Sequence, residues 1–198
     1  MNLKQLPVLV AAAAAALCLS TAARADAPAY PTPGTENPVT YTFTATSTGD
    51  LVAYFAGSTA GYDNTLSVLV NGHATGIFGL DDHTSLYGDS LNFGVVHAGD
   101  VLTFQLNVIT TGDQFYSDKS MNLDGVNHVY STAFTTDGVI PTGTYVAFED
   151  LNGGGDLNYH DETFVFTNVT TAVPEPSSVL LMLAGLGAMG AVARRRRV

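Results

Sequence analysis

Short segments in which apolar and polar residues alternate fill the middle of the chain and limit the folds that it can adopt. The clearest is VLTFQLNVIT, which places four apolar side chains on one face of an extended strand: Leu102, Phe104, Leu106 and Val108. Further strand-like segments are Val39–Ala45, Leu51–Gly57, Thr65–Val70, Leu91–Val96, His128–Thr135, Tyr145–Phe148 and Thr163–Val169. No sustained helical period occurs between the two ends of the chain, so the pattern predicts an all-β protein.

Turn residues separate these segments. Asn71-Gly72 directly follows one of them and is a strong signal for a two-residue hairpin. Short strands joined by Gly, Asn and Asp turns are typical of an antiparallel sandwich or a jelly roll. We therefore expect a single antiparallel, jelly-roll-like β-sandwich over residues 39–170. A flexible leader rich in Pro, Thr and Ala is expected over residues 26–38.

Residues 1–25 have the layout of a secretory signal peptide. One lysine precedes the apolar run VLVAAAAAALCL, and the small residues Ala23 and Ala25 follow it. The layout predicts a signal helix at the N-terminus and cleavage after Ala25, so that the protein is exported. The single cysteine, Cys18, lies inside this segment, and the mature protein must therefore fold without disulfides.

Residues 171–198 predict a second targeting segment with a hydrophobic helix. Val179–Ala193 would span roughly 22 Å as a helix, which is shorter than a bilayer core of about 30 Å. The arginines that follow would stay on the cytoplasmic side of the membrane. These properties predict transient anchoring in the inner membrane, with the β-domain outside the cytoplasm.

The order of elements in this tail resembles the PEP-CTERM sorting signal of Gram-negative bacteria that make extracellular polysaccharide. The residues that carry the resemblance are Pro174, Glu175, Pro176, the apolar stretch, and Arg194, Arg195, Arg196 and Arg197. The resemblance implies cleavage near Pro-Glu-Pro by a membrane exosortase, followed by release or display at the cell surface. It also makes an exopolysaccharide a candidate partner.

The charge balance of the middle of the chain is strongly acidic. Lys119 is the only Lys or Arg between Asp26 and Val173, while nearly all of the 18 acidic residues lie there. Such a domain repels phosphate backbones, so nucleic acid is excluded as a partner. Two interpretations stay open: the acidic residues bind cations, or they provide a soluble surface.

The segment FEDLNGGGDLNYHDE carries the densest chemistry. Its candidate metal ligands are Glu149, Asp150, Asp156, Asn158 and Asp161. Hard oxygen ligands in a glycine-rich loop suit calcium, although the EF-hand spacing is absent. The alternative is ordinary turn chemistry, because Asp, Asn and Gly occupy many β connections.

This segment and FYSDKSMNLDGVNHVYSTAF together resemble the bacterial domain of unknown function 4114 over about Phe115–Val169. The matching residues are Asn122, Asp124, His128, Val129, Phe148, Glu149, Asp150, Leu151, Gly154, Asp156, Asn158, Tyr159 and Asp161. His160 departs from the pattern, which usually has Asn there. The resemblance implies a secreted, calcium-associated protein and brings no established catalytic activity.

We expect no enzyme. The histidines are scattered, no nucleophile elbow is present, and the mature chain has no cysteine. Asp81-Asp82-His83 could form a transition-metal site, but exposed turn residues explain the triplet better. Glu149 and Asp161 could imitate the paired carboxylates of a glycosidase, but calcium binding explains the presence of these two acids equally well.

Two functions stay open for the exported domain. The favoured one is a non-enzymatic component of the cell surface or extracellular matrix that binds calcium. The alternative is a carbohydrate-binding module for a matrix polysaccharide. Trp is absent, so aromatic platforms would have to come from tyrosines such as Tyr54, Tyr62, Tyr87, Tyr116 and Tyr130, which in strands more often serve packing.

Overall fold

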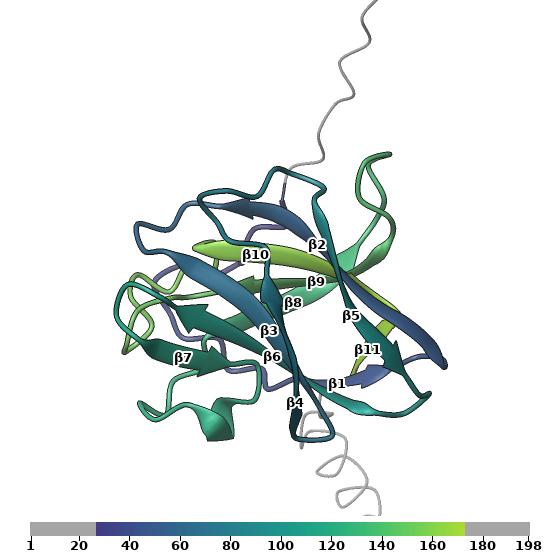
Figure 1. The fold of residues 1–198 in the computed structure, drawn as a ribbon. Coiled ribbons are helices and arrows are strands. Elements are labelled where there is room, and N and C mark those ends of the chain that lie inside the picture. Colours follow the sequence, from purple (N-terminus) through teal and green to yellow (C-terminus); the bar gives the residue numbers. More distant parts are fainter. Residues whose placement is uncertain (1–26, 173–198) are drawn as a thin grey trace, which may run out of the picture.

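The computed structural model describes residues 27–172, which form two antiparallel sheets packed face to face (Figure 1). The first sheet has the order β11-β1-β6-β3-β4, with β7 also paired to β6. The second has the order β5-β2-β10-β9-β8. The all-β class and the antiparallel two-sheet architecture are confirmed, while the predicted signal and sorting helices lie outside the described residues.

The strands of the first sheet are β1 (Thr42–Ala45), β3 (Asn64–Val70), β4 (His73–Gly79), β6 (Val101–Val108), β7 (Asp113–Tyr116) and β11 (Val169–Ala172). Those of the second are β2 (Gly49–Ser58), β5 (Ser90–Val96), β8 (Val129–Phe134), β9 (Gly143–Phe148) and β10 (Glu162–Thr167). A 3-10 turn, η1 (Lys119–Met121), lies between β7 and β8. Within residues 27–172, no helix has the length and apolar character needed to cross a membrane.

The alternating pattern of β6 faces the core as predicted. The four residues of the predicted inward face, Leu102, Phe104, Leu106 and Val108, are all buried, and the Phe104 ring stacks on the Phe166 ring of the opposite sheet, with centroids 3.8 Å apart. Phe43 of β1 packs against Phe104 on the same side. Aromatic residues from both sheets therefore fill the space between them, where burial of apolar surface stabilises the fold.

The predicted hairpin is confirmed at Asn71-Gly72. Val70 pairs with His73, and both turn residues have positive φ, 51° and 78°. This is the conformation of the type I′ turn, whose twist matches that of the flanking strands.

Three strands were not expected from the sequence: β4, β7 and β11. The segment of β4 contains two glycines and is largely exposed, so it lacks a clear apolar face. The predicted run Thr163–Val169 is broken at Asn168, which has a φ of 62°. The chain turns there from β10 in the second sheet to β11 in the first, a change of sheet that the local pattern does not show.

Two residues of the predicted leader are packed against the sandwich. Tyr30 is buried and its ring meets the ring of Tyr159 edge-on, with centroids 4.6 Å apart. The buried Asn37 donates to the carbonyl of Val129 (2.9 Å), and its backbone N–H donates to the Tyr159 hydroxyl (2.8 Å). The leader therefore helps to cover the outer side of the second sheet.

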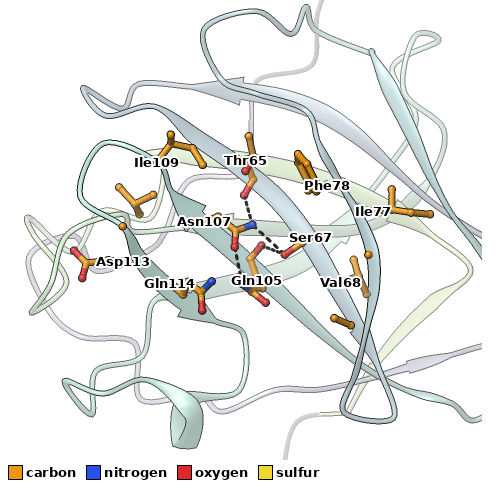
Figure 2. Close-up of a pocket in the computed structure, with 14 residues that line it drawn as sticks. Thr65, Ser67, Val68, Ile77, Phe78, Gln105, Asn107, Ile109, Asp113 and Gln114 are labelled. Atoms are coloured by element: carbon orange, nitrogen blue, oxygen red, sulfur yellow. Dashed lines mark hydrogen bonds between the residues drawn. The ribbon is translucent and has the colours of Figure 1, made fainter.

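The outer face of the first sheet is polar and hollowed where β3, β4, β6 and β7 meet (Figure 2). The hollow has a volume of about 410 Å³. Amide and hydroxyl side chains lie along its floor, and apolar side chains of β4 and of the segment after β6 lie at its edges.

Candidate metal centre

The five predicted calcium ligands lie in the loop between β9 and β10, and the pairing of these strands brings its two ends together. Glu162, the first residue of β10, pairs with Phe148, the last residue of β9. The N–H of Asp161 donates to the carbonyl of Phe148 (3.1 Å), and the N–H of Asp150 donates to the Asp161 carboxylate (3.1 Å). Acidic residues from both ends of the loop therefore meet at one end of the sandwich.

The loop turns tightly because its three consecutive glycines have positive φ. Gly153 and Gly154 both have a φ of 82°, and Gly155 has a φ of 55°, a region that other residues rarely adopt. A Cβ atom on Gly155 would lie 3.1 Å from Oε2 of Glu149. Glycine at this position therefore leaves room beside that oxygen.

Glu149 is fully buried, and only one of its carboxylate oxygens has a hydrogen-bond donor. Oε1 accepts the N–H of Tyr159, whereas Oε2 has no partner among the residues that the structure describes. Burial raises the pKa of Glu149 to about 8, and the nearby carboxylates of Asp161 and Asp156 act in the same direction. A buried carboxylate oxygen that lacks a donor is costly unless a proton or a cation satisfies it.

Asp150 and Asp161 form a second pair of close carboxylates. Asp150 is buried, and its Oδ2 accepts from Nδ2 of Asn64 (2.9 Å). Burial raises the pKa of Asp161, and the Asp150 carboxylate raises it further. Lys119, the only Lys or Arg of residues 27–172, instead forms an ion pair with Glu36 (2.6 Å). No basic Lys or Arg side chain within that range therefore neutralises these acids.

Asp156 and Asn158 contact each other. The Asp156 carboxylate accepts the N–H of Asn158 (3.3 Å) and its side-chain amide (2.5 Å). Asn158 Oδ1 in turn accepts the N–H of His160 (3.1 Å). These are the local bonds of turn chemistry, so the structure gives Asn158 a role in shaping the turn.

The structure thus brings together the predicted ligands only in part. The Asp156 carboxylate is close enough to raise the pKa values of both Glu149 and Asp161, and the N–H of Asp150 donates to the Asp161 carboxylate. Asp81, Asp82 and His83, which lie outside this loop, form a tighter group. Each offers one ligand atom, and in the described part of the chain these three atoms lie within 4.8 Å of one another.

The triplet Asp81-Asp82-His83 lies between β4 and β5. Asp81 Oδ1 accepts the N–H groups of His83 (3.0 Å) and Thr84 (3.1 Å), as expected for a turn residue. His83 is half exposed, and its Nδ1 lies 3.1 Å from the carboxylates of both Asp82 and Asp63. Hydrogen bonding to Asp82 raises the pKa of His83. The ring therefore acts as an ion-pair partner at the surface, while the Asp82 side chain is 1% exposed.

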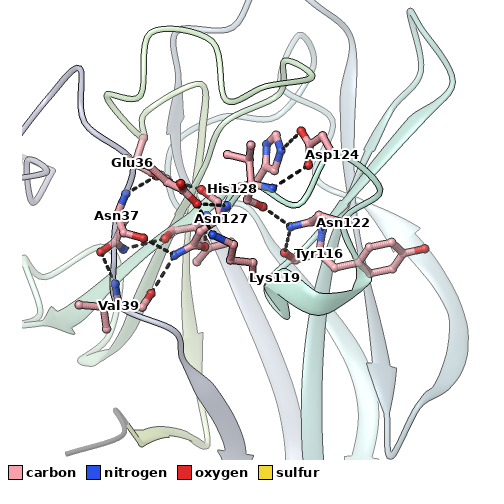
Figure 3. A network of polar contacts seen from close by, with 12 residues as sticks. Glu36, Asn37, Val39, Tyr116, Lys119, Asn122, Asp124, Asn127 and His128 are labelled. Atoms are coloured by element: carbon pink, nitrogen blue, oxygen red, sulfur yellow. Dashed lines mark hydrogen bonds and ion pairs between the residues drawn. The ribbon is translucent and has the colours of Figure 1, made fainter. Parts of the chain in front are cut away.

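The upstream residues of the resemblance form a polar network next to the loop (Figure 3). Asn122 accepts the N–H of Tyr116 (2.7 Å) and donates to the carbonyls of Tyr116 (3.1 Å) and Val126 (2.9 Å). The Asp124 carboxylate accepts the N–H groups of Val126 (3.0 Å) and Gly153 (2.8 Å). Asp124 thereby anchors the glycine-rich turn of the β9–β10 loop.

His128 connects this network to the first residue of the loop. Its Nδ1 faces the carbonyl of Glu149 (2.9 Å), and its Nε2 faces the Asp124 carboxylate (2.8 Å). Each ring nitrogen therefore lies within hydrogen-bond distance of an oxygen atom of the protein. The ring is fully buried and stacks on Phe115 at a centroid distance of 3.8 Å.

The pKa of Asp124 follows from these contacts. Burial acts to raise it, but the N–H groups of Gly153 and Val126 and the His128 ring more than offset burial and leave the pKa lowered. Asp124 is therefore held as a carboxylate. Asn122, Asp124 and His128 were identified from the sequence only by their resemblance to a family pattern. Contacts such as those of His128 with Glu149 and of Asp124 with Gly153 join distant segments, so no local pattern predicts them.

We expect Asp124→Ala to lower the free energy of unfolding by about 3 kcal/mol, because it leaves the buried His128 without its carboxylate and Gly153 without its acceptor. Urea unfolding of the two proteins measures the difference. The matched control is Asp50→Ala, at an exposed position of β2, which should change stability by less than about 0.5 kcal/mol. Equal effects of the two substitutions would contradict the anchoring role.

The raised pKa of Glu149 predicts a pH dependence of the metal-free protein. The folded-state pKa of about 8 lies above the ordinary value of 4.5, so folding takes up a proton between these pH values. The free energy of unfolding should therefore rise as the pH falls from about 8.5 to 5.5. Urea unfolding in EDTA measures this slope, which Glu149→Gln should reduce, while the raised pKa of Asp161 still contributes to it. Glu36→Gln should leave it unchanged, because the Lys119 hydrogen bond lowers the pKa of Glu36.

Two family models match the chain. The model of the PEP-CTERM protein-sorting motif matches residues 172–197, and the model of the domain of unknown function DUF4114 matches residues 86–168. Both resemblances are confirmed, and the second begins near β5 rather than near Phe115. No curated protein and no solved structure matches the chain.

The sorting motif begins at the last described residue, so its Pro-Glu-Pro and arginine cluster lie outside the described part of the structure. Its presence indicates exosortase-dependent sorting, with export and transient membrane anchoring before surface or extracellular localisation. The chain therefore carries a match to the PEP-CTERM sorting motif, which indicates export, and its β-sandwich contains a region that matches DUF4114.

Proposed function

We propose that this protein is a non-enzymatic component of the cell surface or extracellular matrix, and that its β9–β10 loop binds calcium. The observation that carries the calcium site is the fully buried Oε2 of Glu149, which lacks a donor and lies near the Asp156 and Asp161 carboxylates. Calcium prefers hard oxygen ligands in a flexible loop, and these three side chains supply them. Asn158 would orient Asp156.

The contacts of the buried histidine favour a structural over a catalytic role. A general base needs a free nitrogen within reach of a substrate. Both nitrogens of His128 are engaged, by the Glu149 carbonyl and the Asp124 carboxylate, and its ring is covered by Phe115. The remaining acidic pair, Glu149 and Asp161, is accounted for by calcium ligation.

Calcium added to the metal-stripped full chain should raise its melting temperature, because a ligand bound only to the folded state adds about 2.7 kcal/mol of stability at 100 times its Kd. Calorimetric titration with CaCl2 measures binding directly. Asp156→Ala should abolish binding to the loop, whereas Asp50→Ala should retain it. If Asp156→Ala changes neither the titration heats nor the melting temperatures, the loop does not bind calcium and its polar residues only shape the turn.

The hollow on the first sheet supports the alternative function, carbohydrate binding. On its floor, Asn107 donates to the Ser67 hydroxyl (3.0 Å) and to the Thr65 carbonyl (3.1 Å), and Gln105 donates to Asn107 (2.6 Å) (Figure 2). Phe78 of β4 lies at the edge and is 73% exposed. Ordered amides beside an exposed aromatic ring match the hydroxyls and apolar faces of a sugar.

The tyrosines expected to form a sugar platform lie elsewhere. Tyr54, Tyr87 and Tyr130 pack against a second apolar cluster around Tyr145, on the outer side of the second sheet. Tyr116 donates to Gln114 at the border of the hollow (3.0 Å). Tyr54, Tyr87 and Tyr130 therefore serve packing rather than forming a sugar platform. The aromatic side chain at the hollow is Phe78.

A glycan array probed with the full chain tests the alternative. Phe78→Ala and Asn107→Ala should each remove saturable binding to a single class of sugar. Leu123→Ala, which truncates an exposed apolar side chain outside the hollow, should leave binding unchanged. If no sugar class binds, or if the two hollow variants bind as wild type does, the carbohydrate function is wrong.

A further inference from the structure

Two polar side chains point into the core from opposite sheets. In β10, Glu162 precedes the core residues Phe164 and Phe166 at a spacing of two, so all three share the inward face. In β3, Asn64 precedes the core residue Leu66 in the same way. Both residues begin their strands, which places them where the apolar core ends.

Both side chains are completely buried, and each has oxygen atoms without a hydrogen-bond partner among the described residues. Glu162 is 0% exposed, and neither of its carboxylate oxygens has a partner in the described part of the chain. Asn64 is also 0% exposed, and its Oδ1 has none. Three buried acceptors without donors carry a large desolvation cost, which native structures normally avoid.

Asn64 holds two further carboxylates beside its unpartnered oxygen. Its backbone N–H donates to Oδ1 of Asp82 (2.7 Å), and its Nδ2 donates to Oδ2 of Asp150 (2.9 Å). The side chain of Asp82 is 1% exposed and Asp150 is 4% exposed. Both acids are therefore held inside the protein rather than in solvent.

A strand pair places Glu162 on the same side as Asp82. Glu162 pairs with Ser58 of β2, and side chains of directly paired residues lie on the same face of a sheet. The Ser58 hydroxyl donates to Oδ2 of Asp82 (3.4 Å). The Glu162 carboxylate therefore faces the acids that Asn64 holds.

We propose that Glu162, Asp82, Asp150 and the Oδ1 of Asn64 form a buried calcium site that joins the two sheets. This site is separate from the one proposed in the β9–β10 loop and does not depend on it. Its ligands come from β3, β10, the β9–β10 loop and the segment after β4, so a bound cation would connect the two sheets.

The chemistry of the site selects a hard divalent cation. The ligand atoms are all oxygens, and a glutamate that offers both oxygens is a common calcium ligand. The nearby imidazole of His83 instead contacts Oδ1 of Asp82 at the rim, so the set is not that of zinc. Lys119, the only Lys or Arg of the described residues, pairs with Glu36 and does not neutralise these acids.

A proton can replace the cation only in part. Burial raises the pKa of Glu162 well above its usual value, and the Asp82, Asp81 and Asp150 carboxylates raise it further. A neutral carboxyl still leaves an acceptor and a donor unsatisfied in the core. Calcium would displace the proton and satisfy all three orphan oxygens.

The test compares the full chain with Glu162→Gln, which keeps the shape of the side chain but removes its charge. Calorimetric titration with CaCl2 gives the number of ions bound, and melting curves in EDTA and in CaCl2 give the stabilisation. Glu162→Gln should lose one equivalent of calcium. It should also melt in EDTA at the same or a higher temperature than wild type, because an uncompensated buried acid has been removed.

Asp156→Ala is the matched control, because it changes the loop site and leaves the buried site intact. It should retain the calcium equivalent that Glu162→Gln loses. If Glu162→Gln does not fold, Asp82→Asn provides the same comparison, because its amide oxygen can still accept from the N–H of Asn64. This variant lacks one carboxylate ligand and should therefore bind calcium at this site at least tenfold more weakly.

The outcomes separate the two sites. Loss of one equivalent in Glu162→Gln with none lost in Asp156→Ala supports the buried site and removes the loop site. The reverse result overturns the buried site and keeps the loop site. Two further results would overturn the buried site. One is that Glu162→Gln and Asp82→Asn bind calcium with the stoichiometry and affinity of the wild type. The other is that the wild type binds no calcium.

Discussion

The antiparallel pairing of β9 with β10 is the constraint on which the acidic end of the molecule depends. Phe148 and Glu162 are paired residues, and they hold the two ends of the connecting loop next to each other. The pairing buries Glu149 just beyond β9 and turns Glu162 toward the core at the start of β10. Phe164 and Phe166, which follow on the same face, pack into the apolar core and keep β10 in this register.

The same pairing concentrates negative charge where no Lys or Arg of residues 27–172 opposes it. Glu149, Asp150 and Glu162 are all buried, whereas Lys119 is engaged with Glu36. The net stability of a domain is only about 5–15 kcal/mol, so several ionised buried acids would consume much of it. In the metal-free protein, protons relieve part of this cost, since burial raises the pKa values of Glu149 and Glu162. The proposed calcium sites would relieve it when they are occupied.

The region that matches DUF4114 does not form the sandwich alone. Residues 86–168 include β5 to β10, yet β5 pairs with β2, and β6 lies between β1 and β3. The buried polar group spans the same boundary, since Asp150 and Glu162 lie inside the matched region and Asn64 and Asp82 lie outside it. Segments upstream of the matched region thus complete both the fold and the candidate site.

Local sequence patterns were sufficient to predict the all-β class, the inward face of β6, the hairpin at Asn71-Gly72 and the acidic, glycine-rich character of the β9–β10 loop. These features depend on residues that are neighbours in the chain, so periodicity and turn chemistry reveal them. Two features could be seen only in the folded protein: the change of sheet at Asn168, and the contact between Asn64 and Asp150, which lie 86 residues apart in the chain. Such contacts follow from how two sheets pack to bury their apolar faces, which no local pattern records.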